Sequence, residues 1–148
     1  MNAWRAPAAA LVLVLACAGC ASSSRSDEDY RRKAAKTAEA AASAVRTAEI
    51  GVRAAGDGKA TGPYLSALLN EADKDLNEVA GGFMSRQPPG GDADKVRERT
   101  GKLLDQAVDV LDDLRIAVRR GQIGRLPEVG KDLPQIADRL ESLDKELA

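Results

Sequence analysis

The chain of 148 residues has no histidine, and its single tryptophan, Trp4, and its two cysteines, Cys17 and Cys20, all lie near the N-terminus. The rest of the chain therefore has no imidazole to act as a base or metal ligand, no thiolate to bind zinc and no thiol pair for a structural disulfide. We expect no cofactor and no metal site. Aromatic residues make up only 3% of the sequence, which disfavours sites that stack sugars or nucleic-acid bases.

The chain also has no excess of one charge. It carries 22 basic and 23 acidic residues, interspersed, for a net charge of -1. A nucleic-acid partner is not expected, because such proteins present a basic surface. The hydrophobic fraction of 44% is typical of a folded protein.

No apolar run is long enough to span a membrane. The run from Ala6 to Ala16 follows Arg5 and falls short of the roughly 20 residues that a transmembrane helix needs. A charged start followed by a short apolar core is typical of a secretory signal peptide. We therefore expect the protein to be exported.

The end of this run, Leu11 to Cys20, reads Leu-Val-Leu-Val-Leu-Ala-Cys-Ala-Gly-Cys. Small residues followed by cysteine resemble the lipobox of bacterial lipoproteins. The resemblance covers only about the first 20 residues. It implies that the cysteine receives a diacylglyceryl group, that the signal is cut just before it, and that the lipid, with palmitate among its acyl chains, anchors the protein to the cell membrane on its extracytoplasmic side.

Two cysteines compete for the lipid. Cys20 follows Ala18 and Gly19 and precedes a polar segment, although Cys17 stands where the family prefers leucine. Cys17 has bulky Leu15 at a position that is usually small. We favour Cys20 and keep Cys17 as the second choice; an ordinary secretory signal with incidental cysteines is the alternative.

This reading divides the chain into three parts. Residues 1–19 are the removed signal peptide and residues 20–27 are the lipid anchor with a serine-rich, flexible tether. Residues 28–148 are a helical domain. Composition and signal together resemble small lipoproteins of high-GC actinobacteria, a resemblance that assigns no functional residue.

Apolar residues in the domain recur at steps of three and four, which predicts amphipathic helices. Most apolar residues of the first helix are alanine, so this helix can approach its neighbours closely. Because the connections are short, we predict an all-α fold, an antiparallel bundle of three long helices plus a shorter C-terminal helix. The predicted helices span Glu28 to Ala55, Pro63 to Ala80, Ala93 to Arg120 and Leu133 to Leu147, with a helical turn from Leu126 to Lys131.

Three local signals refine the helix ends. Gly81-Gly82 should weaken the end of the second helix, so that Phe83 folds back as a hydrophobic plug. Asp92 is placed to cap the third helix. Asp132 and Gln135 are placed to begin the last helix with a capping box.

A basic cluster follows the tether and consists of Arg31, Arg32, Lys33 and Lys36. Each cation close to an anionic bilayer contributes about 1 kcal/mol to binding. One hypothesis is that the cluster orients the first helix against lipid headgroups. The alternative is an ordinary solvated start of a helix.

Acidic residues align on the third helix at Asp105, Asp109, Asp112 and Asp113. Ligands from one straight helix converge poorly on a cation, so we interpret the row as a solvated face.

The sequence offers no nucleophile with a base. We predict a non-catalytic lipoprotein that binds or scaffolds an envelope protein; a carrier or sensor of a small apolar ligand between helices is the alternative, and an envelope hydrolase ranks last.

Overall fold

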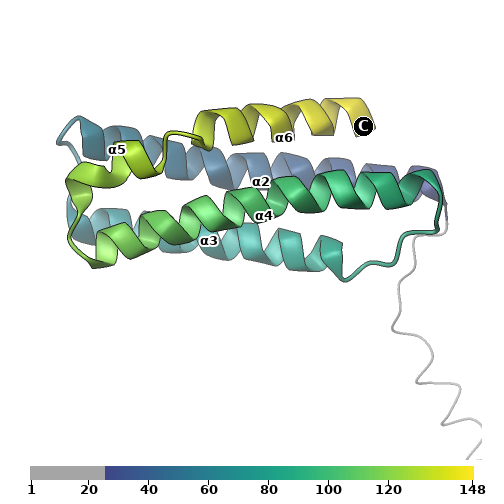
Figure 1. Cartoon of the computed structure of the whole chain (residues 1–148), viewed down its shortest axis with the longest axis horizontal. Helices are drawn as coiled ribbons and strands as arrows, with labels where there is room; N and C mark the ends of the chain where they lie inside the picture. Colours follow the sequence, from purple (N-terminus) through teal and green to yellow (C-terminus); the bar gives the residue numbers. More distant parts are fainter. Residues whose placement is uncertain (1–25) are drawn as a thin grey trace, which may run out of the picture.

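A computed structural model describes residues 26–148, and this part of the chain is helical without strands. Cys17, Cys20 and most of the predicted tether lie outside the described residues. The helices form a bundle in which they lie along one another (Figure 1). This confirms the all-α prediction. The elements are α2 (Asp27–Gly56), α3 (Gly62–Met84), α4 (Asp92–Arg119), the short 3-10 helix η2 (Ile123–Arg125), α5 (Leu126–Val129) and α6 (Leu133–Leu147).

The predicted bounds agree closely with α2, α4 and α6. The prediction for α6 was Leu133 to Leu147, which is the observed range. Pro134 lies in the first turn of α6, where its missing N–H breaks no helical hydrogen bond. The predicted turn from Leu126 to Lys131 is present as α5, and η2 before it was not predicted.

Helix α3 is longer than predicted. It continues through Gly81 and Gly82 to Met84. Phe83 is only 1% exposed and its ring centroid lies 5.4 Å from that of Tyr30 in α2. Burial of this side chain offsets the roughly 1 kcal/mol that each glycine costs a helix. Phe83 is buried while it remains part of α3, so the prediction that it folds back as a plug was wrong.

The predicted cap at Asp92 was wrong, and the predicted cap at Asp132 was right in position but not in its hydrogen bond. Asp92 is the first residue of α4, and the N-cap is Gly91, whose φ of 63° suits glycine. Asp132 stands at the N-cap of α6, but its side chain makes no capping hydrogen bond. The side-chain cap that does form is at α2, where Ser26 Oγ accepts a hydrogen bond of 3.1 Å from the backbone N–H of Asp29.

Helix α2 is the central element of the bundle. It contacts α3, α4, α5 and α6, and Figure 1 shows it between α6 and α3. An alanine side chain is a single methyl group, so neighbouring helices come close and supply the larger side chains of the core. The buried alanines of α2 are Ala34, Ala35, Ala38, Ala41, Ala42, Ala44, Ala48 and Ala55.

Helix α6 is joined to α2 by an ion-pair network. Arg46 donates to Glu141 at 2.9 Å and to Asp138 at 2.5 Å, both in α6, and to Glu49 of its own helix at 2.9 Å. These carboxylates raise the pKa of Arg46, with Glu141 the largest cause. The network covers the outer edge of the α2–α6 contact.

Helices α3 and α4 are joined by a more buried pair. Arg115 of α4 lies 2.8 Å from the Asp73 carboxylate of α3 and donates to Asn70 at 3.0 Å. Asp73 is only 9% exposed and also accepts from Asn77 at 2.9 Å. Because the acceptors lie on one face of α3, this pair fixes how α4 lies along it.

Candidate functional site: a groove between α2 and α3

Two hollows follow one another along the outer edge of the contact between α2 and α3. They measure about 330 Å³ and about 370 Å³, and both are lined by Glu78 and Val79. We call them together the α2–α3 groove. Besides the two shared residues, the groove is lined by Lys33, Lys36, Thr37, Ala40, Ser43, Ala44, Thr47, Asp75, Gly82, Phe83 and Arg86.

The α2 wall of the groove is built from small side chains. Thr37, Ala40, Ala44 and Thr47 recur at steps of three and four, which places them on one face of the helix. The hydroxyl of Thr47 donates to the backbone oxygen of Ser43 at 3.0 Å, so its polar atom is bound to its own helix. The middle of this wall is therefore low, with small side chains only.

The α3 wall combines an apolar floor with an acidic rim. Val79 and Phe83 belong to the core or pack against it. Asp75 and Glu78 are exposed, and neither forms an ion pair with another residue in the range 26–148. Two carboxylates thus remain available to a ligand along the middle of the groove.

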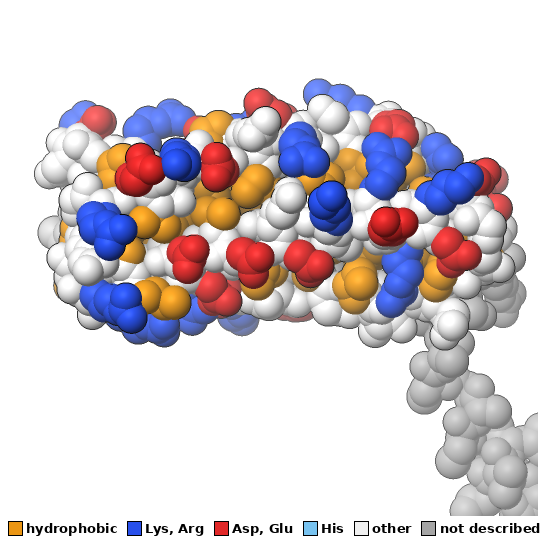
Figure 2. Space-filling model, viewed as in Figure 1, with side chains coloured by type: hydrophobic (Ala, Val, Ile, Leu, Met, Phe, Trp, Pro, Cys, Tyr) orange, Lys and Arg blue, Asp and Glu red, His pale blue; other side chains and the backbone are white. Residues whose placement is uncertain are grey.

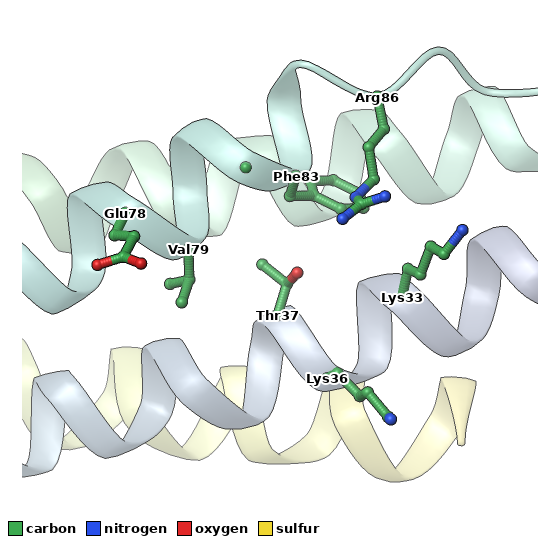
Figure 3. A pocket seen from close by; sticks show the side chains of 8 residues that line it. Lys33, Lys36, Thr37, Glu78, Val79, Phe83 and Arg86 are labelled. Atoms are coloured by element: carbon green, nitrogen blue, oxygen red, sulfur yellow. The ribbon is translucent and has the colours of Figure 1, made fainter. Parts of the chain in front are cut away.

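The end of the groove nearest the start of α2 is basic. Figure 3 shows Lys33 of α2 and Arg86 extending from opposite walls, with the Arg86 side chain reaching back over Phe83. Lys36 lines the same hollow, and in this view its amine points away from α3. The Lys33 amine donates to Asp29 at 2.7 Å, and this hydrogen bond is the largest cause that lowers the pKa of Asp29.

The structure divides the predicted basic cluster. Lys33 and Lys36 lie at the groove, whereas Arg31 and Arg32 do not line it. Arg31 donates to the backbone oxygen of Glu146 in α6 at 3.4 Å. Arg32 forms long ion pairs of 3.7 Å and 3.9 Å with acidic residues of the first turn of α2.

Sequence reasoning missed Arg86 as a functional candidate. It lies in the segment between α3 and α4, where no periodic pattern indicates a facing element. Its position 50 residues after Lys36 also gave no local signal. Only the pairing of α2 with α3 brings these cations to one hollow.

The acidic row of α4 borders a separate hollow of about 630 Å³, which Asp105 and Asp109 line. Asp105, Asp109, Asp112 and Asp113 are all exposed, and Asp112 accepts a hydrogen bond of 3.0 Å from Arg115. Figure 2 shows acidic and basic side chains interspersed with apolar ones on the face of the bundle that α4 and α6 present. Within residues 26–148, no three histidine, cysteine, aspartate or glutamate residues are grouped as metal ligands would be.

Among the described helices, none has the length and apolar character required to cross a bilayer. Comparison of the chain with known protein families, with curated proteins and with solved structures found no match.

Proposed function

We propose that the protein is an exported lipoprotein, anchored through Cys20, whose helical domain binds an envelope protein through the α2–α3 groove without catalysing a reaction. The lipobox resemblance supports the anchor. The observation that carries the binding role is the groove itself, which has an apolar floor, small residues on one wall and two unpaired carboxylates on the other.

The proposal includes the finer arrangement of the domain, an antiparallel bundle of three long helices plus a shorter C-terminal helix. Short segments join the helices, and α2 contacts α3, α3 contacts α4, and α6 contacts α2. Such connections usually join neighbours that run in opposite directions. In this arrangement the groove lies on the side of α2 opposite α6.

The occupant that fits the groove best is an amphipathic helix of the partner. The apolar strip continues beyond the hollows to Ile50 and Tyr64, which are 60% and 52% exposed. A Cβ added at Gly51 would lie 2.4 Å from Leu68 Cδ2, so this part of α2 faces the turn of α3 that follows Tyr64. An apolar helical face laid into such a groove is a common recognition mode.

The charges along the groove favour one orientation of the partner helix. The partner helix should carry lysine or arginine opposite Asp75 and Glu78, because complementary charges across an interface favour one register. The carrier alternative is less well supported. The alanines of α2 that would have to leave room for a small ligand are buried against the neighbouring helices.

Site-specific crosslinking tests the binding role. A photoreactive residue replaces Ser43 in the groove, and a matched control replaces exposed Asp113 on α4. In lipidated protein kept in its native membrane, we expect a discrete protein adduct from position 43 and none from position 113. Equal, diffuse labelling from both positions would contradict a partner at the groove.

Cysteine substitution tests the anchor separately. We expect Cys20→Ala to release the protein from the membrane fraction and Cys17→Ala to leave it there. The intact mass of the mature wild-type protein should correspond to a chain that begins at a lipidated Cys20. If Cys20→Ala stays in the membrane fraction and Cys17→Ala is released from it, the anchor is Cys17.

A further inference from the structure

We propose that the basic end of the α2–α3 groove binds a phosphate group, and that the phosphate belongs to a phospholipid headgroup. The site consists of Lys33, Lys36 and Thr37 of α2 together with Arg86 and Phe83 from the α3 side. The choice of a lipid as the source rests on the proposed anchor at Cys20. The phosphate site itself rests on the geometry of the hollow.

The cations come from two separate parts of the chain and line one space. Lys33 and Lys36 lie about one turn apart on α2, and Arg86 extends toward Lys33 from the other wall (Figure 3). The Lys36 amine points away from α3 in the structure, and rotation of its exposed side chain brings it to a phosphate in the hollow. Lys36 and Arg86 form no ion pair with any residue in the range 26–148. A phosphate oxygen would give them charge-assisted hydrogen bonds, which are the stronger kind, and the Thr37 hydroxyl is a further donor.

The segment that carries Arg86 is held in place from α4. The guanidinium of Arg97 donates to the backbone oxygen of Arg86 and, at 2.7 Å, to that of Met84. These two bonds fix the chain where it leaves α3, and Arg86 itself is half-buried. A cation carried on a fixed, half-buried segment loses less conformational freedom on binding than one on a mobile segment does, which favours affinity.

The surroundings favour a phosphodiester with an organic portion over free phosphate. Phe83 and Val79 give the hollow an apolar floor on which a glycerol ester can lie. Two carboxylates limit the positive charge, Glu78 within the hollow and Asp29 on Lys33. The lining therefore suits a phosphate with one charge better than one with two.

The length of the chain places this end of the groove near the anchor. From Cys20 to Ser26 there are six residue steps, which span at most about 20 Å when extended. Lys33 and Lys36 lie six and nine residues after Asp27, about 9 to 14 Å along α2. A bilayer that holds the lipid of Cys20 is thus within reach of the hollow.

An NMR titration tests the site. The full chain carries Cys17→Ser and Cys20→Ser, so that it bears no lipid. The probes are inorganic phosphate and dihexanoyl phosphatidylglycerol below its micelle concentration, with chloride as the salt control. We expect saturable shifts of the Thr37 and Gly82 amides and of the Arg86 Nε–H, with the lipid binding more tightly than phosphate.

Variants show whether these cations are responsible. Lys36→Gln combined with Arg86→Gln should weaken binding of the lipid by about tenfold or more, because each removes a charged hydrogen-bond donor. Lys145→Gln combined with Arg119→Gln makes the same charge change at exposed positions outside the groove and should leave binding unchanged. Unchanged spectra elsewhere show that the variants remain folded.

Three results would count against the proposal. Shifts that do not saturate, or that the control pair reduces equally, would overturn the phosphate site. If inorganic phosphate binds saturably and the lipid does not bind, the phosphate site is retained, but the phosphate does not belong to a lipid headgroup. The unlipidated chain and soluble probes make this test independent of the anchor and of the protein partner, so each can fail alone.

Discussion

Helix α2 presents small side chains on two flanks, one that faces α6 and one that faces α3, and the two flanks are packed differently. On the α6 flank, buried alanines meet the leucines of a neighbouring helix, and the Arg46 network covers the outer edge. On the α3 flank, Ala40 and Ala44 line an open groove. The comparison shows that a helix of small residues forms either a sealed contact or an open groove, depending on the helix that faces it.

The facing helices account for the difference. Helix α6 presents buried Leu133, Leu140 and Leu143 along its length, which fill the space that alanine leaves. Along the groove, α3 presents Gly82 and the shorter Val79 with Asp75 and Glu78 at the rim. Charged side chains extend to solvent, so they leave the space between α2 and α3 open. The four stability predictions below compare the flanks, from the largest expected effect to the smallest.

Truncation of a leucine should separate the flanks most clearly. Leu140 of α6 is 0% exposed, and Leu140→Ala should lower the free energy of unfolding by about 2–5 kcal/mol because it leaves a cavity. Val79→Ala at the half-buried groove floor should cost about 1 kcal/mol or less. Urea unfolding followed by circular dichroism measures both. Equal losses would mean that the groove is packed as tightly as the α6 flank.

Enlargement of an alanine tests the same contrast in the opposite direction. Ala42 is 4% exposed and lies one turn before Arg46, on the α6 flank, so Ala42→Leu should destabilise the protein by about 1–3 kcal/mol through overpacking. Ala40 is exposed and lines the groove. Ala40→Leu should change the stability by less than about 0.5 kcal/mol. Thermal unfolding of the two variants checks this, and a large loss at position 40 would contradict an open groove.

Two glycines give a smaller contrast. A Cβ at Gly130 would meet Val52 Cγ2 at 2.9 Å, the Leu126 backbone oxygen at 3.2 Å and a Leu133 methyl at 3.2 Å, so Gly130→Ala should cost about 1 kcal/mol or more. A Cβ at Gly51 would overlap the end of Leu68 at 2.4 Å and make an ordinary contact with Leu65 at 3.6 Å; Leu68 is half-buried, and the end of its side chain can move. Gly51→Ala should be neutral or stabilise by up to about 1 kcal/mol through helix propensity. Chemical unfolding midpoints distinguish them, and a destabilised Gly51→Ala would show that Leu68 is fixed.

The pH dependence should be the smallest effect, and the ion pair between Arg99 and Glu146 of α6 is one of its sources. Two hydrogen bonds of 2.7 Å from Arg99 hold the pKa of Glu146 below its ordinary value of 4.5. A carboxylate whose pKa is lowered in the folded state stabilises the protein above 4.5, and this contribution is lost as the pH falls through the lower folded-state pKa.

The measurement is the free energy of unfolding of wild type and Glu146→Gln from acid to neutral pH. The two should differ at neutral pH and converge in acid. Because the chain has no histidine, stability should be nearly flat from about pH 6 to 9. A titration step in that window would contradict this account.

The sequence predicted the helices well because their apolar period is local information. Leu133 to Leu147 was found to the residue, with Pro134 correctly assigned to the first turn. The end of α3 was missed because the burial of Phe83 against Tyr30, a contact between distant residues, outweighed the local signal of two glycines. The cap at Asp92 was missed because α4 begins one residue earlier than predicted, so that Gly91, with a φ of 63°, is the N-cap.

The groove could be predicted only in part. Lys33 and Lys36 were identified by their place after the tether, but their meeting with Arg86 depends on which helices pair. Ala40 and Ala42 look alike in the sequence, and only the positions of α3 and α6 place one in the groove and the other in a buried contact. Such distinctions arise from tertiary packing and leave no local trace.

The most direct test of the binding role is to fill the groove and measure the partner adduct. Ala40→Arg adds a long side chain at an exposed position and should leave the protein folded and anchored. With the photoreactive residue at position 43 in the native membrane, we predict that this substitution abolishes the discrete adduct. An adduct of undiminished yield from the folded, membrane-bound variant would contradict the groove as the site of partner binding.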